Sequence, residues 1–169
     1  LLAVRRVVDR QRGLVVGIHP GAVDVALLAE EARVAEEARL AEEAIRKLGK
    51  VSIFVHCASP PRQETQTALQ VTWEQWRAML SVNLDAAFVI AQKLGRHMVE
   101  KKIKGRMVIT TSLHAESPRN LPHYSASKAG QTMLVKELAR ALGPHGIRVN
   151  AIVPGAIPGE GFKGLPGME

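Results

Sequence analysis

Short β-branched runs alternate along the chain with longer stretches rich in Ala, Glu, Arg and Leu. Strands are expected at residues 4–9, 14–18, 51–55, 107–110 and 147–153, with a further strand end at 22–25. Helices are expected at 26–48, 72–101 and 124–142. This alternation is typical of a parallel sheet with helical crossovers. We therefore expect a single α/β domain over residues 1–169, a doubly wound parallel sheet with helices on both faces.

Turn residues mark the ends of these elements. Gly49 follows the first long helix, where a C-terminal glycine commonly ends one, and Gly143 and Pro144 follow the last. The stretch 112–123, which contains Pro118 and Pro122, is expected to be a loop. Residues 156–169 hold four glycines and two prolines after position 157 and are expected to form a mobile substrate-loop segment.

Composition favours a soluble domain in a reducing compartment. The chain is 46% hydrophobic, with a single cysteine, Cys57, which excludes an internal disulfide. No apolar run approaches the roughly 20 residues that a membrane-spanning helix needs, and the N-terminal stretch lacks the apolar centre of a secretory signal. We expect a cytoplasmic protein with no membrane partner.

The net charge of +7 raises the possibility of a nucleic-acid partner. However, the basic residues are spread along the chain, and the densest cluster is Lys101, Lys102, Lys104 and Arg106, where a helix is expected to end. Aromatic residues make up 4% of the chain, too few for platforms that stack single-stranded bases. We expect no nucleic-acid partner, and an anionic cofactor accounts for part of the charge.

The strongest chemical signal is Tyr124-Ser-Ala-Ser-Lys128. On a helix, positions i and i+4 share a face, so the Lys128 ammonium can lie near the Tyr124 phenol. A nearby cation favours the phenolate and lowers the phenol pKa from its usual value near 10. Such a tyrosine can exchange a proton with a carbonyl or alcohol oxygen. A tyrosine and lysine at this spacing are more often structural, so their context decides.

Two neighbouring segments supply that context. Residues 105–112 form a strand that ends in hydroxyl side chains, and residues 146–155 form a strand that leads into Pro154-Gly155. Ligands bind at the carboxyl ends of parallel strands, so both segments point to one crevice. Over about residues 51–155 the sequence resembles the short-chain dehydrogenase/reductase family in its ordinary single-domain form.

The resemblance implies a catalytic set. Tyr124 would be the general acid/base, and Lys128 would tune it and hydrogen-bond the nicotinamide ribose. Ser112 would polarise the substrate carbonyl, and Asn83 would anchor a proton-relay water. The family usually places its serine thirteen residues before the tyrosine, whereas Ser112 precedes Tyr124 by twelve. Thr111 stands at the expected count; we prefer Ser112, because a proline-bearing loop absorbs a deletion more easily than a strand end.

The resemblance also implies cofactor contacts. Tyr124, Lys128 and the turn of Pro154, Gly155 and Ile157 would lie at the nicotinamide end, and Asp24 with Val25 would lie against adenine. The usual Asn-Asn-Ala-Gly appears here as His56-Cys57-Ala58-Ser59, so that only Ala58 is kept. A metal or thiol site at His56 and Cys57 lacks further ligands at suitable spacing. We expect no metal, and a structural hydrogen bond from His56.

The glycine-rich phosphate turn of the family is missing before residue 51. That turn matters because backbone N–H groups at a helix N-terminus hold the pyrophosphate. Residues 4–10 could be the family's second strand, with Asp9 accepting from an adenosine ribose hydroxyl; the adjacent Arg10 could instead favour a 2′-phosphate. On this alignment the N-terminal βα unit is missing or altered, and the chain is truncated at both ends.

Taken together, these features predict an oxidoreductase that interconverts a small-molecule carbonyl and an alcohol with NAD or NADP. The two long helices at 72–101 and 124–142 resemble those that pair subunits in the family, which predicts a homodimer or homotetramer. Two alternatives remain open: a non-catalytic interaction protein derived from such an enzyme, and a related sugar-nucleotide epimerase, which shares the tyrosine and lysine.

Overall fold

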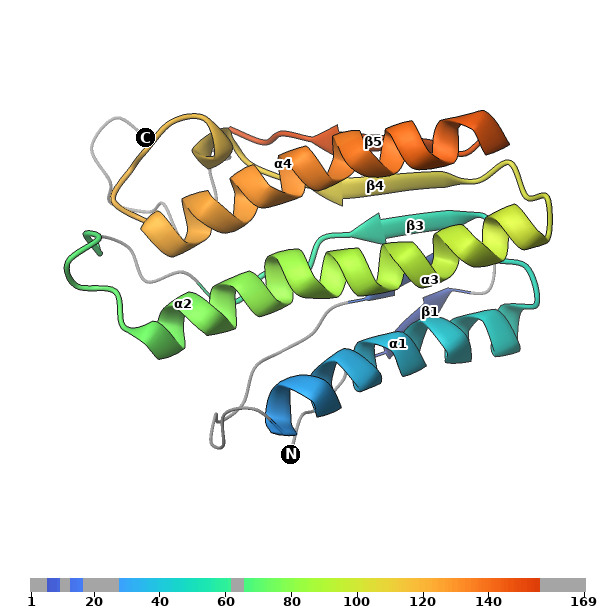
Figure 1. Cartoon of the computed structure of the whole chain (residues 1–169), viewed down its shortest axis with the longest axis horizontal. Coiled ribbons are helices and arrows are strands. Elements are labelled where there is room, and N and C mark those ends of the chain that lie inside the picture. The colour runs from blue at the N-terminus through green and yellow to red at the C-terminus, as the bar shows by residue number, and fades with distance from the viewer. Residues whose placement is uncertain (1–5, 10–12, 17–27, 62–65, 156–169) are drawn as a thin grey trace.

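The computed structural model describes residues 6–9, 13–16, 28–61 and 66–155. Within these ranges it contains a five-stranded sheet and long helices (Figure 1). In chain order the elements are β1 (Arg6–Asp9), β2 (Gly13–Val16), α1 (Leu28–Leu48), β3 (Ile53–His56), α2 (Trp73–Leu80), η1 (Ser81–Asp85), α3 (Ala86–Glu100), β4 (Arg106–Thr110), η2 (Leu113–Ala115), α4 (Pro122–Leu142), η3 (Gly143–His145) and β5 (Arg148–Ile152).

The strands follow one another across the sheet in chain order, β1-β2-β3-β4-β5. Strands β2 to β5 are parallel, which confirms the expected α/β class. The first pair differs, because β1 runs antiparallel to β2, with Asp9 opposite Gly13. Only three residues separate these two strands, far fewer than a crossover to a parallel neighbour requires. The expectation of a fully parallel sheet is therefore wrong at this edge.

The long helices α1, α3 and α4 lie side by side over one face of the sheet (Figure 1). Crossovers between parallel strands are nearly always right-handed, and each one here steps to the next strand in the same direction, which puts the crossover helices on the same face. The long helices that the structure describes thus all lie on this face of the sheet. Strand β3 shows the consequence: Phe54 is fully buried beneath the helices, whereas the preceding side chain, Ile53, is 42% exposed.

The core lies between the sheet and this helical layer. Phe54 and Met107 on the strands pack in one cluster with Ile90, Leu94 and Met98 on α3. Helix α1 contributes the small side chain of Ala41 to this cluster, and Leu40 and Ile45 pack against it from the same helix. Its alanine and glutamate content also favours the helix intrinsically.

The helix expected over 72–101 forms, with an interruption. Thr72 caps α2 through a reciprocal capping box with Gln75. A π-helical segment, η1, then joins α2 to α3 without a break in the chain's helical path. Such segments are frequent at functional sites, and this one contains Asn83. Helix α4 begins at Pro122, two residues before the expected start, because proline suits the first turn of a helix.

Candidate active site

Backbone hydrogen bonds join the carboxyl ends of β4 and β5 at one edge of the sheet. The Thr111 N–H donates to Ile152 O at 2.8 Å, and the Leu113 N–H donates to Pro154 O at 3.2 Å. These bonds fix the segment that carries Ser112 against the turn that follows β5. The two segments predicted to share a crevice are therefore adjacent.

Tyr124 and Lys128 lie in the first turns of α4, beside this edge. Both are buried, with Lys128 only 3% exposed. The Lys128 Nζ lies 5.4 Å from the centroid of the Tyr124 ring. It donates to Thr110 O at 2.8 Å and to Gln131 Oε1 at 2.9 Å. The lysine thus lies beside the Tyr124 ring, as the spacing of the pair predicted, and the carbonyl at the end of β4 holds its ammonium at the sheet edge.

Asn83 reaches the same helix from η1. Its Nδ2 donates to Ser127 Oγ at 2.8 Å, and the Ser127 hydroxyl donates to Tyr124 O at 2.8 Å. Its Oδ1 is buried and accepts no hydrogen bond from the described residues. Next to Asn83, Leu84 packs on Gly130 of α4, where an added Cβ would lie 2.9 Å from Leu84 Cδ2. Asn83, Ser127 and Tyr124 therefore form one connected group.

The two candidate hydroxyls before Tyr124 have different surroundings. The Thr111 Oγ1 donates to Ile152 O at 3.2 Å, so that hydroxyl is used within the sheet. The Ser112 Oγ accepts from the His114 N–H at 3.2 Å, which leaves its own O–H to donate elsewhere. The His114 ring in turn packs edge-on against Tyr124, with centroids 5.2 Å apart. Ser112 thus shares its loop with a residue that touches Tyr124.

His56, at the end of β3, lies beneath this group and is 1% exposed. Its Nδ1 lies 3.4 Å from Gln131 Nε2. Burial, and then the positive charge of Lys128, lower the pKa of His56 to about 4. The imidazole is consequently neutral at physiological pH. The expected structural hydrogen bond is present, although the ring accepts rather than donates it, because an amide nitrogen can only donate.

The residues predicted to contact a cofactor are only partly brought together. Ala58 follows β3 and Pro154 with Gly155 follows β5, all at the carboxyl edge that carries Tyr124 and Lys128. Asp9 does not join them. Because β1 is antiparallel, its carboxyl end lies at the opposite edge of the sheet, which corrects the interpretation of this segment as the family's second strand. Asp24, Val25 and Ile157 lie outside the described residues.

Two buried residues of the site, Gln131 and Ser127, were missed by sequence reasoning. Both are fully buried, and both hydrogen-bond to predicted site residues. A signal was present, because Gln131 and Lys128 are three positions apart and share a helix face. A polar side chain that shares a buried face with a predicted catalytic lysine is expected to have a partner there.

In the part of the chain that the structure describes, no three His, Cys, Asp or Glu side chains lie close enough together to hold a metal ion. None of the helices described there is long and apolar enough to cross a membrane.

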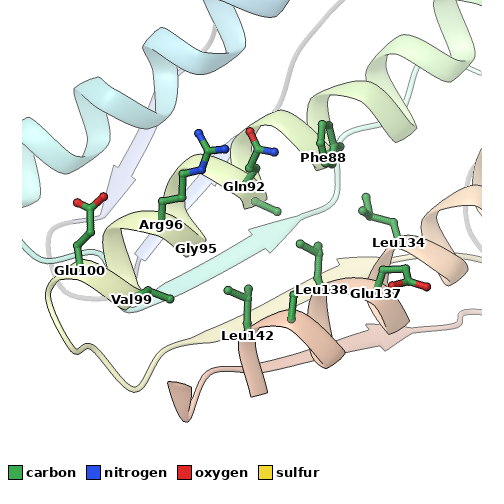
Figure 2. A pocket seen from close by; sticks show the side chains of 12 residues that line it. Phe88, Gln92, Gly95, Arg96, Val99, Glu100, Leu134, Glu137, Leu138 and Leu142 are labelled. Carbon is green, nitrogen blue, oxygen red and sulfur yellow. The ribbon is translucent and has the colours of Figure 1, made fainter. Parts of the chain in front are cut away.

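An apolar hollow of about 470 Å³ lies between α3 and α4 (Figure 2). Leu134 and Leu138 line it from α4, and Phe88 and Val99 line it from α3. None of the predicted catalytic residues lines it. It follows the C-terminal half of α4, whereas Tyr124 stands at the start of that helix. The hollow is therefore a feature separate from the candidate active site.

Comparisons with known proteins agree on one kind of enzyme. Residues 21–169 match a family model described as enoyl-(acyl carrier protein) reductase. A probable galactose dehydrogenase, GalD of Rhizobium meliloti (strain 1021), is 41% identical over 115 residues, which are 68% of this chain and 44% of that protein.

Solved structures give the same result. The acetoin dehydrogenase YohF from Salmonella typhimurium superposes with a TM-score of 0.67 at 34% identity, covering 72% of this chain and 47% of the other. An NAD⁺-bound xylitol dehydrogenase superposes with a TM-score of 0.65 at 28% identity, covering 75% of this chain and 46% of the other. The chain thus spans less than half the length of these relatives.

Proposed function

The chain belongs to the short-chain dehydrogenase/reductase family, a family of oxidoreductases, and from that premise we propose that it carries the proton-transfer site of a nicotinamide-dependent enzyme. The proposed reaction interconverts a carbonyl and an alcohol on a small molecule. The observation that carries the proposal is the buried Lys128 ammonium beside the Tyr124 ring.

Each of the chain's own groups has a defined part in this reaction. The Tyr124 phenol gives a proton to the carbonyl oxygen, or takes one from the alcohol in the reverse direction. The Lys128 ammonium stabilises the phenolate form by its charge. The Ser112 hydroxyl donates to the substrate oxygen and holds it near the phenol. Asn83, through Ser127, fixes the backbone of the turn on which Tyr124 stands.

The described residues fit the nicotinamide end of a cofactor. Lys128 is held at the sheet edge by Thr110 O, next to the turn at Pro154 and Gly155, where it can donate to ribose hydroxyls. The cofactor, when bound, would supply or accept the hydride. The described residues contain no glycine-rich phosphate turn. The choice between NAD and NADP therefore depends on residues that face the adenosine end.

A direct test is titration of the full-length protein with NADH and with NADPH, followed by nicotinamide fluorescence. We expect saturable binding of one of them, and a loss of about tenfold in affinity for Lys128→Met, because a charged hydrogen bond is removed. Lys136→Met, at an exposed position of the same helix, is the matched control. Absence of saturable binding for both cofactors would favour a non-catalytic interaction protein.

We further propose that the hollow between α3 and α4 is where subunits of this protein pair. Its lining is largely apolar, and Phe88 at its rim is 44% exposed (Figure 2). A second copy of the same helix pair can cover such a surface in a symmetric dimer. This assembly leaves the edge that carries Tyr124 open to substrate.

A further inference from the structure

Gln131 has an unusual position for an amide side chain. It is fully buried in α4, three residues after Lys128, where an apolar residue would be ordinary. Its Oε1 accepts from the Lys128 Nζ at 2.9 Å. Its Nε2 donates to the main-chain carbonyl of Asn83 and faces the His56 Nδ1 at 3.4 Å. One amide therefore contacts β3, η1 and α4.

The chemistry of its partners fixes the orientation of this amide. An ammonium group can only donate, so the oxygen of Gln131 must face Lys128. The amide nitrogen then faces Asn83 O and His56, and since that nitrogen can only donate, the His56 Nδ1 must accept. His56 is therefore neutral, with its proton on Nε2. Burial and the Lys128 charge maintain this state, because both hold the His56 pKa near 4.

We infer that Gln131 is a positioning residue that fixes the Lys128 ammonium beside Tyr124 by tying it to the Asn83 main chain and to neutral His56. The inference rests on the proposed function of the pair. With Thr110 O as its one acceptor, the Lys128 ammonium could still swing about that hydrogen bond. The Gln131 Oε1 is a second acceptor that prevents this motion, because the Gln131 amide is itself held by Asn83 O and His56. These hydrogen bonds thereby fix the positions of β3, η1 and α4 relative to one another at the site.

The first test is independent of turnover and needs no variant. Two-dimensional ¹⁵N NMR of the histidine side chains in the full-length protein reports which ring nitrogen carries the proton. We expect the Nε2–H tautomer for His56 and no protonation above pH 5. An Nδ1–H tautomer would overturn the inference, because the ring could not then accept from Gln131.

The second test uses Gln131→Glu and Gln131→Met. The carboxylate of Gln131→Glu would face Lys128 and His56. Its negative charge should raise the pKa of His56 by more than about 1 unit. It should also move the pH dependence of alcohol oxidation to higher pH by about 1 unit, because it offsets the positive charge of Lys128 beside Tyr124. Gln131→Met removes the hydrogen bonds to Lys128, Asn83 O and His56 and should lower kcat about tenfold with little change in KM. Thr132→Val, which alters the same helix at a hydroxyl bonded to Lys128 O, is the control.

The outcomes separate this inference from the proposed function. An inactive wild-type protein, or full activity in Tyr124→Phe, would refute the proposed function and with it the role given to Gln131. If the wild type is active and Tyr124→Phe is not, unchanged kcat and pH profiles in both Gln131 variants would refute only the positioning role. Should Gln131→Met fail to fold, the isosteric Gln131→Glu and the wild-type tautomer still decide the question.

Discussion

The Lys128 ammonium lies 5.4 Å from the centroid of the Tyr124 ring, one helical turn further along α4. Both side chains are buried, with exposures of 3% and 9%. In such surroundings a positive charge acts on the phenol more strongly than it would in water. The lysine cannot move away freely, because Thr110 O and Gln131 Oε1 both accept from it. This fixed, buried cation beside a phenol is the geometry that the proposed proton transfer requires.

Ser112→Ala and Thr111→Val should have different effects. Loss of the Ser112 hydroxyl should lower kcat about 100-fold, because a donor to the reacting oxygen is removed. Thr111→Val should leave kcat nearly unchanged and lower the free energy of unfolding by about 1 kcal/mol, because its hydroxyl bonds to Ile152 O. Steady-state kinetics and urea unfolding measure the two effects. The reverse pattern would assign the substrate contact to Thr111.

Ser127→Ala should weaken both the fold and the reaction. It removes the acceptor of Asn83 Nδ2 and the donor to Tyr124 O in a fully buried place. We expect the free energy of unfolding to fall by about 1–3 kcal/mol and kcat to fall with it. Ser52→Ala, at the amino end of β3, is the control. Equal effects of the two substitutions would mean that the connection from Asn83 to Tyr124 has no special role.

Glu37→Gln should raise the free energy of unfolding, relative to that of the wild type, as the pH rises from 5 to 8. Glu37 is 2% exposed, and its burial raises the pKa of its carboxyl to about 7. The positive charge of Arg33 lowers this pKa and the negative charge of Asp85 raises it, but burial has the largest effect. The folded state thus binds more protons than the unfolded state between about pH 4.5 and 7, so its stability falls as the pH rises through that range. From pH 5 to pH 8, the variant should gain about 1–2 kcal/mol relative to the wild type.

Urea unfolding at the two pH values measures this gain. Glu36→Gln on the same helix, where the carboxylate is paired with Arg39 at a more exposed position, should show no comparable change. A gain of the same size in both variants would contradict the role given to burial of Glu37.

Phe88→Glu should dissociate the proposed dimer. Phe88 lines the hollow between α3 and α4 and is already 44% exposed, so the substitution costs the subunit fold little, whereas it places a charge inside the proposed interface. Light scattering should show the mass fall to that of a monomer. Leu69→Glu, also an exposed apolar position but outside the hollow, should keep the wild-type mass. An unchanged mass for Phe88→Glu would place the interface elsewhere.

The sequence predicted the helices, the parallel strands β3 to β5 and the pair at Tyr124 and Lys128, because periodicity and spacing are local signals. It did not predict the antiparallel β1, although the stretch between the first two expected strands is too short for a crossover and was a signal for it. The expected position of Asp9 beside an adenosine ribose depended on a parallel β1 and was wrong because β1 is antiparallel.

The candidate site residues also differ in whether a local motif or a long-range contact identifies them. Asn83 and Ser112 were proposed from motifs, whereas Gln131 has no motif, and its contacts form only when η1 and β3 are packed against α4. The π-helical form of η1 was also not predicted, because the sequence indicated one continuous helix over 72–101. Long-range polar contacts of this kind require the fold before they can be assigned.

The measurement that tests the account most directly is the turnover of Tyr124→Phe in the full-length protein, with nicotinamide binding and circular dichroism recorded on the same sample. The variant lacks only the phenolic oxygen and keeps the ring that packs against His114. We expect kcat to fall about 1,000-fold or more, with cofactor affinity and fold unchanged. Undiminished turnover would contradict the assignment of Tyr124 as the acid/base of this protein.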